Sequence, residues 1–162
     1  MVRALLQPFI VWSYNVPPAH WVRDSTWAFP ILEVFHLLGL TLLLGSVFLF
    51  ALRCFGLTLQ KDPTIRVARD MAPASLAGII IMAFSGYLMF ASGAIKYANN
   101  LAFQCKMALF FTAIVVHGVG YMRVRVASVG HDGSRVQWVM AGGLILLLWF
   151  GVGIAGRAIA FL

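Results

Sequence analysis

Residues 29–52 read FPILEVFHLLGLTLLLGSVFLFAL, and this stretch decides the fold. A helix needs about 20 predominantly apolar residues to cross the roughly 30 Å hydrocarbon core of a bilayer. The stretch exceeds that length, and Glu33 and His36 are its only ionisable side chains. It therefore predicts a transmembrane helix.

Three further stretches of the same kind follow, at 71–95, 101–122 and 136–156. The chain is 62% hydrophobic and 10% charged, and its mean hydropathy of +0.92 lies far outside the range of soluble domains. Four spans leave almost no residues for a soluble domain. We therefore expect an all-α integral membrane four-helix bundle over 29–162.

The segment 1–28 precedes the first span. Its apolar run Ala4–Trp12 resembles the core of a secretion signal, but it contains Pro8 and lacks a small-residue cleavage pattern. Aromatic side chains of the kind that settle at the membrane–water interface recur through the segment: Trp12, Tyr14, Trp21 and Trp27. We therefore expect an N-terminal interfacial arm.

Two signals mark the passage from the arm to the first span. Pro17-Pro18 should interrupt a helix, because proline has no backbone N–H. Asp24 or Ser25 can cap the helix that follows, because a short side-chain oxygen accepts a hydrogen bond from its first N–H groups.

Positively charged residues predict the orientation of the bundle, because they are retained on the cytoplasmic side. The connections after the first and third spans hold seven of them: Arg53, Lys61, Arg66, Arg69, Arg123, Arg125 and Arg135. The opposite side holds five: Arg3, Arg23, Lys96, Lys106 and Arg157. This majority predicts that both termini lie outside the cytoplasm.

Charge and cysteine content argue against two other kinds of site. The formal charge of +7 is spread over loops on two sides of a membrane, without the basic stripe that holds a nucleic-acid backbone. Cys54 and Cys105 are expected at opposite ends of the bundle, so they cannot form a disulfide. Neither has a close His or Cys partner for zinc. We expect no nucleic-acid partner.

Polar groups at membrane depth are the candidates for chemistry, because a charge in hydrocarbon costs several kcal/mol and is rarely kept without a partner or a function. Those candidates are Glu33, His36, Lys106, His117 and Arg157. Glu33 and His36 share one helix face at i and i+3. Lys106 and His117 share another, eleven residues apart.

The basic residues at the helix ends allow a comparison of depth, at 1.5 Å per helical residue. His36 lies 17 residues before Arg53, and Lys106 lies 17 residues before Arg123. Both should therefore lie roughly 25 Å above the cytoplasmic connections, whereas His117 should lie only about 9 Å above them. His36 and Lys106 are expected at one level, and His117 a layer deeper.

This offset bears on haem ligation. Both axial ligands of a haem must reach one iron, so a His36–haem–His117 arrangement with a separation of roughly 16 Å is disfavoured. The predicted site lies in the outer half, where His36 ligates haem iron and Lys106 and Glu33 lie beside it. Arg157, at the outer end of the fourth span, would suit a haem propionate.

His117 has two interpretations. A lone intramembrane histidine often forms a hydrogen bond to a neighbouring helix. If a second haem site exists, His117 would instead be its ligand, with Met71 or Met140 opposite.

Two simpler alternatives apply to the other polar and sulfur groups. Glu33 and Lys106 can neutralise one another in an ion pair that sets the helix register. Met82 and Met89 lie on one face of the second span, and thioethers favour Cu(I), although methionine is also common packing material.

The chain resembles an uncharacterised bacterial four-helix inner-membrane family related to copper-resistance D proteins and HemJ-type protoporphyrinogen oxidases. The resemblance covers about residues 19–117 and rests on three stretches: WAFPILEVFHLLG at 27–39, LAG at 76–78 and FQCKM at 103–107. The HemJ type is similar in having a histidine in the first helix and a lysine near the start of the third, matched here by His36 and Lys106. Because those proteins bind haem b, the resemblance implies haem b here, and a location in the bacterial inner membrane.

These observations predict a small b-type haem membrane protein that transfers electrons with quinone or a larger redox complex. His36 would be an axial ligand, and Lys106 the opposite ligand or a propionate partner. One alternative is a HemJ-like protoporphyrinogen oxidase. Another is a cofactor-free accessory subunit of a membrane complex.

Overall fold

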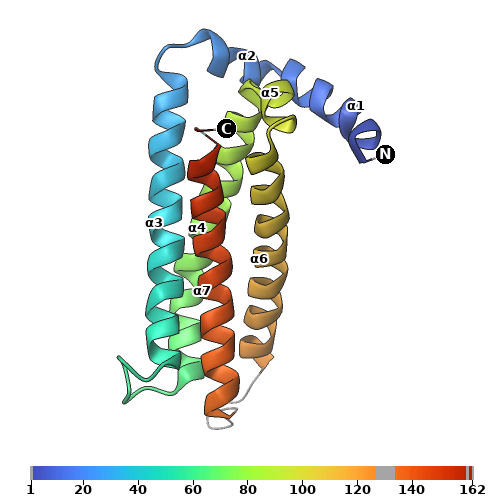
Figure 1. The fold of residues 1–162 in the computed structure, drawn as a ribbon. Coiled ribbons are helices and arrows are strands. Elements are labelled where there is room, and N and C mark those ends of the chain that lie inside the picture. Colours follow the sequence, from blue (N-terminus) through green and yellow to red (C-terminus); the bar gives the residue numbers. More distant parts are fainter. Residues whose placement is uncertain (1, 127–133, 160, 162) are drawn as a thin grey trace.

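Four long helices form the body of the molecule in the computed structural model, which describes residues 2–126, 134–159 and 161 (Figure 1). They are α3 (Ala28–Cys54), α4 (Thr64–Ser92), α6 (Leu101–Val126) and α7 (Arg135–Ala158). Each is long and apolar enough to cross a membrane. The described residues contain no strand. The predicted all-α membrane bundle is confirmed.

Large apolar side chains cover much of the outer surface of this bundle. Examples more than half exposed are Val34, Leu38, Ile80, Phe84, Phe111, Val115 and Leu147. A surface of this kind is unfavourable in water and matches the hydrocarbon core of a bilayer. The chain is therefore a multi-pass membrane protein whose helices contact lipid.

The second long helix differs most from its predicted bounds, since it begins at Thr64 rather than Met71. Arg66 and Arg69, which we expected in a connection, lie instead in its first turns. Hydropathy marks only the apolar part of a helix, whereas hydrogen bonding continues into polar turns beyond it. At the other end α4 stops at Gly93, and the short helix α5 (Ala94–Ala98) follows.

The N-terminal arm forms two helices across one end of the bundle, α1 (Val2–Asn15) and α2 (Pro17–Asp24) (Figure 1). They break at Val16, whose backbone is extended, because the residue before a proline disfavours the helical region. Pro8 lies inside α1 without ending it. The N-cap residue of α3 is Trp27 rather than Asp24 or Ser25, but the Ser25 side chain still accepts a hydrogen bond from the Ala28 N–H at 3.2 Å.

The connection from α3 to α4 is closed by backbone and side-chain contacts. Gly56 adopts a positive φ of 75°, and its N–H donates to the Arg53 carbonyl while the Leu57 N–H donates to the Leu52 carbonyl. This pair of bonds is a Schellman motif, which ends a helix and favours glycine.

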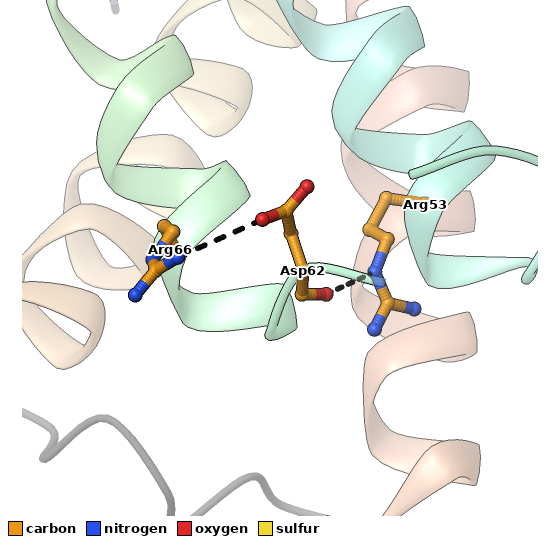
Figure 2. Close-up of polar contacts among 3 residues, drawn as sticks. All are labelled: Arg53, Asp62 and Arg66. Carbon is orange, nitrogen blue, oxygen red and sulfur yellow. Dashed lines mark hydrogen bonds and ion pairs between the residues drawn. The ribbon is translucent and has the colours of Figure 1, made fainter. Parts of the chain in front are cut away.

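Figure 2 shows how Asp62 links the two helix ends. The Arg53 Nε donates to the Asp62 carbonyl at 2.9 Å, and the Asp62 carboxylate lies 3.7 Å from the Arg66 guanidinium. Both members of this ion pair are exposed, so it contributes at most about 1 kcal/mol. The link orders the connection more than it stabilises the fold.

The tightest packing in the bundle is between α3 and α4. A Cβ added at Gly78 would lie 2.7 Å from both the Gly39 carbonyl oxygen and the Leu43 backbone nitrogen. Only glycine permits this approach, as is common where membrane helices cross. A cluster of buried side chains around the crossing joins all four long helices: Leu43, Val47, Met82, Ala113, Ile145, Trp149 and Val152.

Candidate functional site

His36 packs against α4 at the next turns after the glycine crossing. Its Cε1 would lie 3.0 Å from a Cβ at Gly86, and its Nδ1 lies 3.0 Å from the Ser85 hydroxyl oxygen. That hydroxyl is 2.6 Å from the Ile81 carbonyl, which can only accept. The single Ser85 proton is therefore used on Ile81, and the same oxygen accepts from the His36 Nδ1–H.

This network assigns the tautomer of His36. With Nδ1 protonated, Nε2 keeps its lone pair, and no hydrogen bond to it occurs among the described residues. A histidine that ligates a metal through one nitrogen almost always donates a hydrogen bond from the other. His36 has the arrangement that a metal ligand requires.

His117 on α6 has the opposite arrangement. The Trp149 indole N–H donates to His117 Nδ1 at 3.2 Å, and His117 Nε2 lies 3.1 Å from the Ser75 hydroxyl. An indole nitrogen can only donate, so Nδ1 carries the lone pair and Nε2 carries the proton. Ser75 in turn donates to the Ala72 carbonyl at 2.9 Å. Both ring nitrogens are used in joining α4, α6 and α7.

This bonding argues against His117 as an axial ligand. If Nε2 gave its lone pair to a metal, the neutral ring would carry its proton on Nδ1, directed at the Trp149 N–H. Two donors would then face one another inside the bundle, and each would lack an acceptor. Of the two interpretations of His117, the structure shows the hydrogen bonds to neighbouring helices.

The separation of the two histidines along the bundle follows from the positions of their serine partners on α4. Ser75 and Ser85 are ten residues apart on α4, which corresponds to about 15 Å along the helix. His36 and His117 therefore occupy different layers, as expected from their spacing to the basic residues at the helix ends. Sequence reasoning missed both serines and Trp149, because serine and tryptophan in an apolar helix carry no signal of which helix they face.

Lys106 lies on α6 and faces α7. Its Nζ would be 3.3 Å from a Cβ at Gly156 on α7, so the side chain extends across the fourth span. Among the described residues Lys106 has no hydrogen-bond or ion-pair partner.

The other two predicted residues of this site stand apart from it. Glu33 is exposed and forms no ion pair with Lys106 within the described part of the chain. Arg157 is exposed too, and its guanidinium lies over the Phe161 ring at 5.5 Å. The structure thus directs His36 at α4 and Lys106 at α7, and it leaves Glu33 and Arg157 exposed.

A cavity of about 810 Å³ lies at the other end of the bundle, where α3 joins α4. All four long helices line it, and the lining includes His117 together with Met71 and Met140, the residues considered for a second haem. The sequence had no signal for this cavity beyond the small residues that leave it unfilled, such as Ala72 and Gly120.

Comparison of the chain with protein-family models, curated proteins and solved structures found no match. Within the described residues, no group of three or more His, Cys, Asp or Glu side chains could hold a metal ion. Met82 is buried in the core cluster, where it packs against apolar neighbours. The interpretation of the site therefore depends on the geometry of His36 and Lys106.

Proposed function

We propose that the protein is a small b-type haem membrane protein in which His36 Nε2 is an axial ligand to haem iron. The observation that supports this proposal is the hydrogen bond from His36 Nδ1–H to Ser85, which leaves the Nε2 lone pair available. His117, with both nitrogens bonded, lacks this property.

The remaining side chains have supporting roles in this proposal. Ser85 holds the imidazole in one orientation and tautomer, since its own proton is used on Ile81. Lys106, which is half-buried, would be a second ligand or would hold a propionate, and Arg157 offers a second positive group near that end. When bound, a haem supplies reversible one-electron redox chemistry, which suits electron transfer with quinone or a larger redox complex.

An absorption spectrum of the detergent-solubilised protein tests the proposal directly. A Soret band as isolated, with sharp α and β bands after dithionite, is the expected result. Protein produced with sufficient haem that shows no Soret band would contradict the proposal and favour a cofactor-free accessory subunit.

Substitution of Lys106 should change the properties of the haem. Lys106→Ala removes a positive group that the residue spacing places at the level of His36, so the Soret position or the midpoint potential should shift. His117→Ala is the matched control on the same helix, and it should leave both nearly unchanged. It should still lower the free energy of unfolding by about 1 kcal/mol, since it removes interhelical hydrogen bonds. Loss of haem from the His117 variant alone would contradict the assignment.

We propose further that the protein lies in the bacterial inner membrane with both termini outside, as the majority of basic residues predicts. Native Cys54 is buried and unsuited to labelling, whereas Lys61 and Lys96 are exposed at opposite ends of the bundle. In a Cys105→Ser background, an impermeant thiol reagent added to intact cells should label Lys96→Cys and spare Lys61→Cys. The reverse pattern would invert the topology.

A further inference from the structure

The cavity of about 810 Å³ lies between α3, α4, α6 and α7, at the end opposite His36, and it is of the size that takes a small organic ligand. Its walls are mostly apolar, with Val47, Ile65 and Ile145 among the buried side chains. Of the four long helices, α6 has the fewest buried residues and packs more loosely on α4 than on α7. The space between them is thus a property of the helix arrangement.

Three polar side chains in the deep part of the cavity, away from its opening, already have hydrogen-bond partners within the protein. Ser46 donates to the Leu42 carbonyl at 2.7 Å, while Ser75 and His117 belong to the hydrogen-bonded chain described above. None of these three side chains offers a free donor to a ligand without breaking a bond within the protein. Among the described lining residues, the buried donor without a partner is the indole N–H of Trp138, which lies in the first turn of α7 near the opening. The deep part of the cavity therefore suits an apolar chain better than a polar group.

The opening of the cavity is different, because it lies among exposed polar side chains. Tyr121, Arg123 and Gln137 line it there, and all three are exposed. Other basic residues surround this end of the bundle: Arg53, Lys61, Arg66, Arg69, Arg125 and Arg135. The described acidic residues there are Asp62 and Asp70, and Asp62 is paired with Arg66. The field at the opening is positive.

We propose that this cavity binds an acyl-chain lipid with an anionic headgroup, its chain between the helices and its headgroup at Arg123. An apolar interior beneath a positive rim complements that ligand at both ends. A membrane phospholipid and a free fatty acid share this chemistry. The site does not depend on haem, since it lies in the layer of His117 and not of His36.

Two glycines on α6 provide a matched test. A Cβ added at Gly118 or at Gly120 would meet no atom within 4 Å, but only Gly120 lines the cavity. Both Gly→Leu changes replace a poor helix former, so neither should unfold the protein. Gly120→Leu should displace about two methylenes of the bound chain and weaken binding about tenfold. The Gly118→Leu variant should bind the lipid with the same affinity as the parent protein.

Native mass spectrometry of the full-length protein in detergent supplies the measurement. Dioleoylphosphatidylglycerol, dioleoylphosphatidylcholine and oleate are added separately as probes. We expect phosphatidylglycerol or oleate to bind more tightly than phosphatidylcholine, and the tighter of these two identifies the source of the ligand. Arg123→Gln should reduce the preference for the anionic probe about fivefold, the effect of one cation near a headgroup.

Three results would overturn the proposal. One is equal lipid occupancy in the Gly118→Leu and Gly120→Leu variants, which would place the bound lipid outside the cavity. The second is an unchanged preference in Arg123→Gln, and the third is no preference for anionic probes in the parent protein. Either of these two would remove the headgroup contact.

Discussion

His36→Ala should remove most of the haem b absorption from the purified protein. Neutral imidazole is the commonest haem ligand in proteins, and among the described histidines only His36 combines a bonded Nδ1–H with an unbonded Nε2 at membrane depth. His117, the other described histidine within a long helix, lies about 15 Å away along the bundle and cannot replace it. Haem content per protein and the Soret absorbance are the measurements.

A second variant separates ligation from folding. Ser85→Ala keeps the imidazole but removes the acceptor of its Nδ1–H, so haem should still bind, with weaker affinity by about 10- to 100-fold. Helical circular dichroism and elution volume should match the parent protein for both variants. Full haem occupancy in a well-folded His36→Ala variant would refute the assignment.

Gly78→Leu should destabilise the bundle far more than the same substitution at Gly118. Its Cβ would lie 2.7 Å from backbone atoms of α3, the Gly39 oxygen and the Leu43 nitrogen, and backbone cannot rotate away as a side chain can. The helices must therefore separate, which costs at least about 1–3 kcal/mol of overpacking and disturbs the contact between His36 and Ser85. Unfolding in mixed micelles with increasing sodium dodecyl sulfate measures the loss.

Gly118→Leu is the control for this experiment, because a Cβ at that position meets no atom within 4 Å. It should unfold at the same detergent fraction as the parent protein, or slightly later. Equal stability of Gly78→Leu and Gly118→Leu would show that α3 and α4 do not cross as closely as described.

The sequence identified the fold class because the bilayer imposes a length and a composition on every span. The first, third and fourth helices lie within four residues of their predicted bounds, whereas α4 begins seven residues early, at Thr64 rather than Met71. Its first two turns contain Arg66, Arg69 and Asp70, which are helical but not apolar. Hydropathy detects contact with lipid, and it cannot detect a helix that continues beyond the hydrocarbon.

The level of each polar group along the bundle was also a property of the sequence, since rise per residue is constant in a helix. That His36 and His117 lie in separate layers could be read from residue spacing. The direction in which each points could not, because membrane helices are apolar on all sides and their pattern does not mark the inner face.

The tertiary structure therefore decided the chemistry of the two histidines. The glycine crossing of α3 and α4 sets which residues of the two helices meet. It places the polar Ser85, rather than one of the apolar residues of α4, against His36. Trp149 meets His117 through the packing of α6 on α7. Each imidazole then carries its proton where its neighbour accepts one, so the available lone pair depends on helix rotation and not on the local sequence.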